Sequence, residues 1–210
     1  MPWLMAKLYD RMMAGTEQAC LQAWRQELLA DVSGDVLEIG AGTGANLEFY
    51  GADVRRLLLT EPDPHMSALL LRKLAARAGS SSTAEVQTAS IEQLPFADAS
   101  FDTVVGTLVL CSVADPARAI AEIHRVLRPG GRLLFIEHVA ADDNPGRLRW
   151  QHRLEPLWKR IAGGCHLTRD TGAALRAAGF VIEGEQRSSM RKAPPVVRPT
   201  IRGVARKLSA

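Results

Sequence analysis

The sequence predicts an α/β fold in which a mostly parallel sheet is covered by helices on both faces. Three observations favour this class. Short apolar segments alternate with helical segments through the middle of the chain, the first apolar segment runs directly into a cluster of glycines, and no internal repeat or long linker interrupts the pattern. Parallel strands need helical crossovers, so this alternation indicates one sheet. A length of 210 residues suits one such domain.

Strands are expected wherever a short run of Val, Leu, Ile or Thr is bounded by polar or glycine residues. Residues 101–110 give the strongest signal and residues 85–88 the weakest. Pro194 and Pro195 should interrupt any strand near them, because proline has no N–H to donate. The expected strands cover residues 35–39, 56–60, 85–88, 101–110, 132–139 and 180–185.

Helices are expected where apolar residues recur on one helical face. In residues 116–127 the recurring positions are Ala119, Ile120, Ile123 and Leu127, and a breaker follows at residues 128–131. Residues 79–82 should form a loop. We expect an N-terminal helical lid segment over residues 1–33 and the main domain over residues 34–210. The expected helices are two within residues 1–33, then 64–78, 116–127, 146–162 and one from Thr168 or Asp170 to Ala178.

The net charge of +3 is unevenly distributed. The chain from residue 186 onward has seven basic residues and no acidic one, so the rest has 26 − 7 = 19 basic against 23 acidic residues. Such a basic segment is most often a solvated face, and it can also contact an anionic membrane peripherally. We expect no nucleic-acid partner.

The three cysteines, Cys20, Cys111 and Cys165, are far apart in sequence. Neither a disulfide framework nor a metal site is expected from their spacing, and a reducing cytoplasmic compartment fits them best. The first residues lack the charged leader and apolar core of a signal peptide. No apolar run approaches the roughly 20 residues of a membrane-spanning helix.

The glycine cluster, Gly40-Ala41-Gly42-Thr43-Gly44, follows the first strand and is the candidate floor of a ligand site. Glycine lets the backbone approach a ligand closely, and parallel sheets bind ligands at the carboxyl ends of their strands. Glu61 follows the second strand, 61 − 44 = 17 residues beyond Gly44. A carboxylate there can accept hydrogen bonds from both hydroxyls of a ribose.

The surroundings of the glycines favour a cationic ligand over a dinucleotide. The spacing is G-x-G-x-G and not G-x-G-x-x-G, and Asn46 stands where a pyrophosphate site needs close packing. Glu38 precedes the first glycine, and its carboxylate would repel a pyrophosphate. S-adenosylmethionine carries a sulfonium and an ammonium group, so a negative field suits it.

Several segments between residues 35 and 140 together resemble the class I methyltransferases, in particular the type 11 subgroup that contains quinone-biosynthesis enzymes. Residues 37–44 resemble motif I, Glu61-Pro62 the acidic motif, residues 91–96 with 100–102 the adenine-flanking stretch, and residues 125–131 the helix-to-strand turn. The resemblance implies a Rossmann-like, mostly parallel seven-stranded sheet and S-adenosylmethionine as cofactor. The implied cofactor-binding residues are Glu38, Gly40, Ala41, Gly42, Thr43, Gly44, Asn46, Glu61, Pro62, Met66, Ser90, Ile91, Glu92, Thr107 and Leu108.

One position departs from that subgroup. Ser90 stands where the subgroup usually has an aspartate that bonds the adenine amino group. Adenine recognition would then rely on the backbone around Ser90 and Ile91, or on the Ser90 hydroxyl as an acceptor.

A second resemblance, from about residue 35 to 180, is to the mammalian methyltransferase-like thiol S-methyltransferases. It is carried by residues 44–50, 61–65, 107–113, 155–159 and 164–169, with Trp150-Gln151. The N-terminal membrane anchor of that family is expected to be absent. The resemblance implies S-methylation of a small thiol, with His138 or His166 as the candidate base. Candidate substrate-binding residues are Tyr9, as a lid, with Cys111, Glu137, Trp150 and Cys165.

Each candidate side chain also has an ordinary structural interpretation. A histidine is more often structural than catalytic, and a cysteine or tryptophan often serves only in packing. An alternative function keeps the cofactor and methylates an oxygen, nitrogen or carbon of a quinone, phospholipid or secondary metabolite. A third class, a non-enzymatic cofactor- or partner-binding module, is disfavoured by the intact set of motifs.

Overall fold

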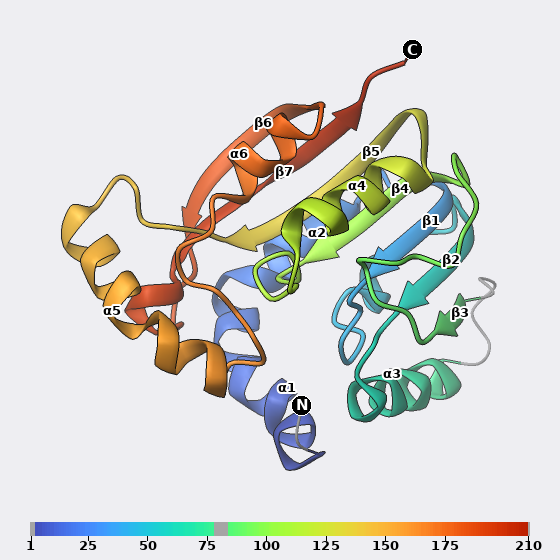
Figure 1. Ribbon diagram of the computed structural model, residues 1–210. Helices are drawn as coiled ribbons and strands as arrows, with labels where there is room; N and C mark the ends of the chain where they lie inside the picture. Colours follow the sequence, from blue (N-terminus) through green and yellow to red (C-terminus); the bar gives the residue numbers. More distant parts are fainter. Residues whose placement is uncertain (1–2, 78–83, 210) are drawn as a thin grey trace.

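The computed structural model describes residues 3–77 and 84–209 and shows one seven-stranded sheet with helices on both faces (Figure 1). The strand order is β3-β2-β1-β4-β5-β7-β6. The first five strands pair in parallel, and β7 pairs antiparallel with both β5 and β6. The predicted fold class is therefore confirmed. The strands are β1 (Gly34–Ile39), β2 (Val54–Thr60), β3 (Ala84–Gln87), β4 (Phe101–Thr107), β5 (Leu127–His138), β6 (Phe180–Ser189) and β7 (Pro199–Lys207).

The helices that follow the central strands begin at side-chain caps. Asp63, Asp115, Asn144 and Asp170 each accept a hydrogen bond from a backbone N–H in the first turn of the next helix, which satisfies groups that have no partner within the helix. The predicted boundaries hold to within a few residues, and the predicted loop at 79–82 lies outside the described residues. The helices are α3 (Pro64–Ala76), α4 (Pro116–Val126), α5 (Pro145–Ile161) and α6 (Thr171–Ala177), with short 3-10 turns η2 (Leu47–Phe49) and η3 (Pro195–Val197).

The N-terminal segment forms one continuous helical rod and not two separate helices. α1 (Trp3–Thr16) and α2 (Gln22–Leu29) are joined by a π-helical turn, η1 (Glu17–Leu21), whose flanking residues keep helical backbone angles. The joining turn itself contains no Gly or Pro, and Gly15 just before it lies within α1. The two predicted helices are therefore present as α1 and α2, and the structure adds that a π-helical turn joins them without a break. Along the rod, α1 crosses beneath the sheet toward α3 (Figure 1).

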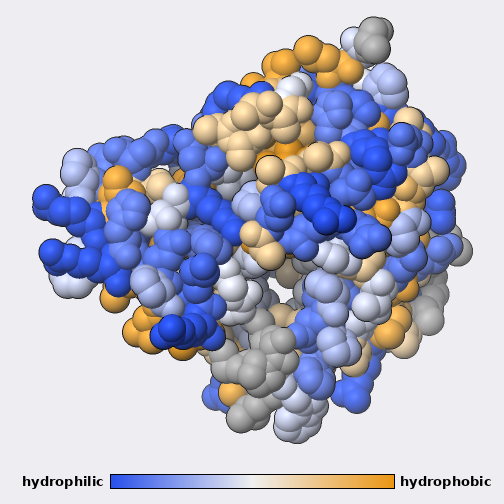
Figure 2. Space-filling model, in the orientation of Figure 1, coloured by the Kyte–Doolittle hydropathy of each residue, from blue (hydrophilic) through white to orange (hydrophobic). Residues whose placement is uncertain are grey.

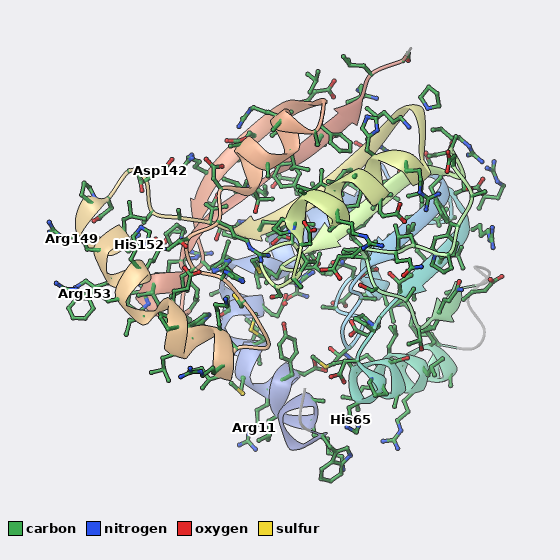
Figure 3. All side chains as sticks on the ribbon, viewed as in Figure 1. Arg11, His65, Asp142, Arg149, His152 and Arg153 are labelled. Carbon is green, nitrogen blue, oxygen red and sulfur yellow. The ribbon has the colours of Figure 1, made fainter. Side chains whose placement is uncertain are left out.

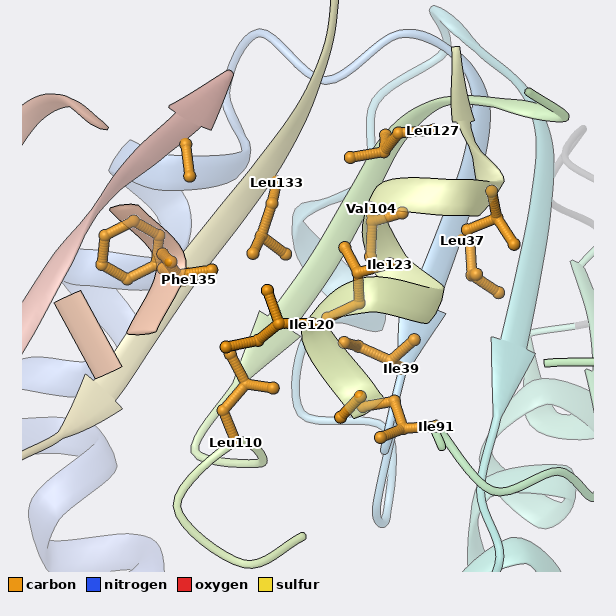
Figure 4. Packing of buried hydrophobic residues seen from close by; sticks show 14 of the residues in the cluster. Leu37, Ile39, Ile91, Val104, Leu110, Ile120, Ile123, Leu127, Leu133 and Phe135 are labelled. Carbon is orange, nitrogen blue, oxygen red and sulfur yellow. The ribbon is translucent and has the colours of Figure 1, made fainter. Parts of the chain in front are cut away.

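Alternate residues of the strands build two cores on opposite faces of the sheet. Leu37 and Ile39 of β1 pack with α4 and α6, whereas Val36 packs with α2, η2 and α3. Figure 4 shows Ile120 and Ile123 of α4 lying over the central strands beside Val104, Leu133 and Phe135. Successive side chains of a strand point to opposite faces of the sheet, so neighbouring residues of β1 belong to different cores.

The C-terminal segment is part of the sheet, which the sequence did not predict. β7 lies between β5 and β6, and β6 runs on to Ser189. Three of its arginines pair with carboxylates from other parts of the chain: Arg187 with Asp142, Arg202 with Glu27, and Arg206 with Glu183. The basic segment therefore has acidic partners in space that are absent from its own sequence.

No helix among the described residues is both long and apolar enough to cross a bilayer. On the face shown in Figure 2, hydrophilic residues predominate and the surface is hollowed between the α5 side and the α3 side.

Candidate active site

The glycine turn after β1 is shaped for close approach by a ligand. Gly40 and Gly42 have φ angles of +59° and +58°, which non-glycine residues rarely adopt. A Cβ atom on Gly40 would lie 2.3 Å from Cγ2 of Val109, whereas a Cβ on Gly42 would meet nothing within 4 Å. Gly40 is therefore required for packing against the turn after β4, while Gly42 borders open space.

Glu61 connects the end of β2 to this turn. Its Oε2 atom accepts a hydrogen bond from the Gly42 backbone N–H at 2.8 Å, and its Oε1 atom accepts one from the Asp63 backbone N–H at 2.9 Å. The residue is 7% exposed, and burial raises the pKa of its carboxyl group. Each carboxylate oxygen retains a lone pair for a further donor, so Glu61 can both support the turn and receive hydroxyl groups.

A first cavity of about 380 Å³ lies over the carboxyl ends of β1, β2 and β4. Its size falls at the low end of the range for small-ligand sites. Residues that the sequence predicts to bind the cofactor meet here from four separate segments of the chain. The cavity is lined by Tyr9, Gly40, Gly42, Glu61, Pro62, Asp63, Met66, Ala89, Ser90, Ile91, Glu92, Leu108, Val109, Ser112, Val113, Ala114, Ala162 and Gly163.

A second cavity of about 330 Å³ shares four lining residues with the first: Tyr9, Gly40, Gly42 and Leu108. It reaches under α1 and α2 and is richer in charged side chains. Its other lining residues are Asp10, Met13, Ala14, Glu17, Gln18, Gln22, Arg25, Glu38, Ala41, Thr43, Ala45, Glu48, Lys73 and Thr107.

A buried polar network forms the wall of the second cavity. Asn46 Nδ2 donates to Glu38 Oε1 at 3.0 Å, and the Tyr50 hydroxyl donates to Glu38 Oε2 at 2.7 Å. Arg25 Nη1 donates to Asn46 Oδ1 and to Thr107 Oγ1, both at 2.7 Å. Burial raises the pKa of Glu38 to about 7. Glu38 is therefore a carboxyl group that an adjacent cation would readily ionise.

Arg25 is a site residue that the sequence interpretation missed. It is 4% exposed and forms an ion pair with Glu17 at 3.0 Å. It stands four residues after Leu21 and four before Leu29, both fully buried, so a charged residue occupies the apolar stripe of the helix. The position of an arginine on the apolar face of a helix could have indicated this role, because a buried guanidinium needs hydrogen-bond or ion-pair partners.

The helical rod is also tied to the glycine turn by Asp10, another residue not predicted. Asp10 Oδ1 accepts a hydrogen bond from the Thr43 hydroxyl at 2.5 Å, and its other carboxylate oxygen pairs with Lys73 of α3 at 2.9 Å. These contacts hold Tyr9 at the junction of the two cavities. Burial raises the pKa of Tyr9 to about 12, so its phenol is neutral at physiological pH.

The segment after β3 closes the far side of the first cavity. The Ser90 hydroxyl donates to Glu92 Oε2 at 2.9 Å, while Glu92 Oε1 accepts from the backbone N–H groups of Ala114 and Asp115. Glu92 therefore joins this segment to the loop before α4. Leu108, after β4, has a φ angle of +58°. A non-glycine residue held in this region is strained, and such strain concentrates at functional sites.

Glu137 and His138 end β5 and are almost fully buried, at 0% and 2% exposure. The Glu137 carboxylate accepts hydrogen bonds from the backbone N–H groups of Val109, Leu110 and Cys111 at 2.9 to 3.1 Å. Burial raises the pKa of Glu137 to about 7. The Glu137 side chain therefore holds the backbone of the turn after β4. Glu137 is not among the residues that line the two cavities.

His138 lies in a cluster with two thiols. Its Nε2 atom is 3.5 Å from Cys165 Sγ, which is 3.8 Å from Cys111 Sγ. The hydrogen bond between the two sulfurs lowers the pKa of Cys165 and raises that of Cys111. Ser112, next to Cys111, and Gly163, two residues before Cys165, line the first cavity. The cluster therefore lies next to that cavity.

His166 is held differently. Its Nδ1 atom lies 2.9 Å from Glu155 Oε1, and the Thr168 hydroxyl donates to the other Glu155 oxygen. Burial raises the pKa of Glu155, but the hydrogen bonds with Thr168 and His166 outweigh burial and lower it. Glu155 therefore stays ionised at neutral pH. A carboxylate that orients a histidine is the arrangement of a general base, and His166 is partly exposed.

Trp150 is not at the site, and this prediction is corrected. Its side chain is 56% exposed on α5 and its ring packs against Arg153, with 5.5 Å between the ring centroid and the guanidinium carbon. The neighbouring Arg149, His152 and Arg153 project outward from the same helix in Figure 3. Its neighbour Gln151 is fully buried, so the helix faces the domain with Gln151 and the solvent with Trp150.

Comparison with known proteins identifies the family. A methyltransferase domain model matches residues 37–135. The human protein named thiol S-methyltransferase TMT1B is 40% identical over 182 residues, which span 85% of this chain and 74% of that protein. A phosphatidylethanolamine N-methyltransferase of Cereibacter sphaeroides is 34% identical over 113 residues, about half of each chain (53% and 54%).

Among solved structures, the Bacillus YcgJ protein superposes with a TM-score of 0.71 at 16% identity, and the match covers 90% of this chain and 98% of that one. At this level of identity the likeness concerns the fold alone.

Proposed function

The chain belongs to the S-adenosylmethionine-dependent methyltransferases, and from this premise we propose that it methylates the sulfur of small thiols. The observation that carries the proposal is the pair of joined cavities, which meet at Gly40, Leu108 and Tyr9 beside a cluster of thiol and imidazole groups. The similarity to thiol S-methyltransferases over most of the chain supports the choice of acceptor.

The first cavity suits the adenosine half of the cofactor. Glu61 offers two carboxylate oxygens to the ribose hydroxyls, as acidic residues do at this position in related sheets. The Ser90–Ile91 segment and Met66 would flank the adenine. Because the Ser90 hydroxyl is hydrogen-bonded to Glu92, the backbone of this segment is the better source of adenine contacts.

The second cavity suits the amino-acid half, which bears an ammonium and a carboxylate. Arg25 supplies a buried positive charge and Glu38 a carboxyl group that a cation would ionise. Opposite charges in one low-dielectric pocket would orient a zwitterion more strongly than either charge alone. The sulfonium would then lie where the two cavities join, near Tyr9 and Leu108.

Methyl transfer is an in-line displacement, so the protein must align the acceptor sulfur and exclude water. The lid formed by α1 contributes to both, because Tyr9 covers the junction and Asp10 fastens the helix to Thr43. A free thiol has a pKa of about 8.5 and attacks as thiolate. The two candidate proton acceptors are His166, which Glu155 orients, and His138, which contacts Cys165; neither is among the residues that line the two cavities.

The three cysteines are free, which fits the reducing cytoplasm as the compartment in which this protein works.

A phospholipid is the second candidate acceptor. Trp150, Leu157 and Ile161 are each more than half exposed on α5, a helix that also bears several arginines on its outer face (Figure 3). Exposed apolar residues among basic ones are typical of a helix that rests on an anionic membrane. This surface, and not the ion-paired C-terminal segment, would make the membrane contact.

The test is transfer of a labelled methyl group from S-adenosylmethionine to alkyl thiols, phenols and phosphatidylethanolamine vesicles. We expect turnover with the thiols. Turnover of the phospholipid without the thiols would replace the first proposal by the second. A failure of calorimetry to detect cofactor binding would refute both. Replacing His138 or His166 by Asn should identify the base, because its loss would lower the rate at neutral pH and allow partial recovery at high pH.

A further inference from the structure

Three potential metal ligands from distant parts of the chain meet beside the active site. Cys111 lies in the turn after β4, His138 ends β5, and Cys165 lies between α5 and α6. Their ligand atoms all lie within 4.8 Å of one another. The linear spacing of these residues matches no zinc motif, so this cluster is visible only in the fold.

Two of the three distances within the cluster match those between ligands of a tetrahedral zinc ion, and the third, between Cys111 and His138, is at most 4.8 Å. Bonds of about 2.3 Å to sulfur and about 2.0 Å to nitrogen place two sulfurs ~3.8 Å apart and a sulfur and a nitrogen ~3.5 Å apart. The observed distances are 3.8 Å between Cys111 Sγ and Cys165 Sγ and 3.5 Å between Cys165 Sγ and His138 Nε2. The ligand set also fits, because thiolates with imidazole favour zinc over the hard cations.

Ordinary core packing does not account for His138. The residue is 2% exposed, and its Nδ1 atom has no hydrogen-bond partner among the described residues. Its other ring nitrogen, Nε2, meets a thiol and not an oxygen or nitrogen partner, which makes Nε2 the atom available to a metal ion. The Cys165 sulfur is the one polar contact of this imidazole within the described part of the chain.

The cluster borders the space that the acceptor must occupy. Ser112, next to Cys111, and Gly163, two residues before Cys165, both line the first cavity. Tyr9 lines both cavities, at the junction where the acceptor would meet the cofactor. A tetrahedral ion held by three protein ligands keeps a fourth position for a further ligand, as catalytic zinc sites do.

We propose that Cys111, His138 and Cys165 bind Zn²⁺ and leave its fourth position for the sulfur of the acceptor thiol. The second half of this inference rests on the proposed thiol acceptor, whereas metal binding does not. Zinc coordination deprotonates a thiol at neutral pH. The site would therefore select sulfur acceptors over alcohols and amines.

The reaction balances without a further reactant. The acceptor thiol binds zinc and loses its proton to His166 or water. The zinc-bound thiolate attacks the methyl carbon with one electron pair, so a new sulfur–carbon bond forms. The methyl–sulfonium bond breaks, and its electron pair returns to the cofactor sulfur. The product thioether is neutral and a weaker ligand than thiolate, so it leaves the metal.

The test uses the reduced full-length protein titrated with Zn²⁺ and with Co²⁺. We expect one tight site per chain and, with Co²⁺, the visible and thiolate charge-transfer absorption of a tetrahedral site. Cys111→Ser and Cys165→Ser should each weaken binding by about 100-fold or more. Cys20→Ser is the matched control, because Cys20 lies in the helical rod, and it should bind metal as the wild type does.

Absence of a stoichiometric site in the wild-type protein would overturn the inference, and this result does not depend on whether any variant folds. Equal metal affinity in the folded Cys111→Ser and Cys165→Ser proteins would also overturn it. The open position is tested by adding 1-butanethiol to the cobalt protein. A shifted charge-transfer band supports acceptor coordination, and an unchanged spectrum refutes it.

The inference and the proposed function fail in distinguishable ways. Zinc binding without any thiol methylation would refute the function and leave the metal site standing. Thiol methylation at an undiminished rate in protein stripped of metal by a chelator would refute the catalytic role of zinc and leave the function standing.

Discussion

The regions that we assign to the cofactor and to the acceptor are built in different ways. The proposed cofactor half comprises Glu38 near the end of β1, the glycine turn after it and Glu61 after β2, so the shape of two short segments places these groups. The proposed acceptor half comprises Cys111, His138 and Cys165, which come from three separate segments and meet through side chains. The first half depends on local chain shape and the second on the position of whole elements.

This difference predicts that damage to one half leaves the other intact. The two halves share the residues at the cavity junction but have separate hydrogen-bond networks, since Glu38 is bonded by Asn46 and Tyr50 and His138 by Cys165. Sites without shared partners usually respond independently to substitution. Cofactor affinity and metal affinity are therefore the two readouts that separate them.

The largest effect is expected for Gly40→Ala. The new Cβ would clash with Val109 at a φ of +59°, so the turn must shift, and cofactor affinity should fall by about 100-fold, or about 2.7 kcal/mol. Gly51→Ala is the control, because a Cβ there meets nothing within 4 Å and its φ is not positive. Calorimetry measures both. Unaltered cofactor binding by Gly40→Ala would contradict the proposed role of the turn.

Arg25→Met should come next. It removes the buried charge that bonds Asn46 and Thr107, and we expect about a 30-fold loss of cofactor affinity, since hydrogen bonds to charged groups contribute about 1.5–3 kcal/mol. The exposed Arg56, which pairs with Glu85, provides the control variant Arg56→Gln. Similar affinities for the two variants would show that Arg25 only supports the fold.

Glu61→Ala should raise the cofactor dissociation constant at least tenfold, about 1.4 kcal/mol. It removes the acceptor for two backbone N–H groups and for the ribose. Zinc affinity should be unchanged, so this variant distinguishes most clearly between the cofactor half and the acceptor half. A matching change at the exposed Glu85 should have no effect on either readout. Normal cofactor binding would show that Glu61 is misassigned.

Glu38 gives a smaller, pH-dependent effect. Because burial raises its pKa from 4.5 to about 7, the folded protein holds this proton more tightly than the unfolded chain. Its contribution to stability is complete below pH 4.5 and is lost as pH rises through 7. Binding of the cationic cofactor should ionise Glu38 and release a proton below pH 7. Calorimetry in buffers of different ionisation enthalpy measures that proton, and Glu38→Gln should abolish the release. Persistent release in this variant would contradict the assignment.

Trp150→Ala should have the smallest effect on thiol methylation, about twofold or less, because the ring is exposed on α5. The same variant should weaken binding to anionic vesicles if phospholipid is the acceptor. A large loss of activity with a soluble thiol would restore Trp150 to the substrate site.

The same contrast explains what could be predicted from sequence. Gly40, Gly42 and Glu61 lie at strand ends, where glycine conformation and strand position set the geometry, so the proximity of these residues in space could be predicted from the sequence. β7 was missed because its Arg-rich sequence lacks the apolar run of a buried strand, although Ile201 and Ala205 are buried. The Cys111–Cys165 contact was missed because 54 residues separate the two.

Trp150 is the converse case, a residue that the sequence placed at the substrate site and that the structure places on the surface. A tryptophan beside a predicted site is a reasonable substrate contact, yet helical phase alone decides which residue faces the domain. Here Gln151 faces inward, where it bonds the backbone of Ala141, Val139 and Val196. A buried glutamine next to an exposed tryptophan reverses the usual burial preference, and only the tertiary contacts reveal it.

The most direct test of the central claim places a matched alkanethiol and alkanol of equal chain length in one reaction with the wild-type protein and methyl-labelled S-adenosylmethionine. Mass spectrometry of the products then reports which atom received the methyl group. The account predicts label in the thioether alone. Label in the ether, or in neither product while the cofactor binds normally, would contradict it.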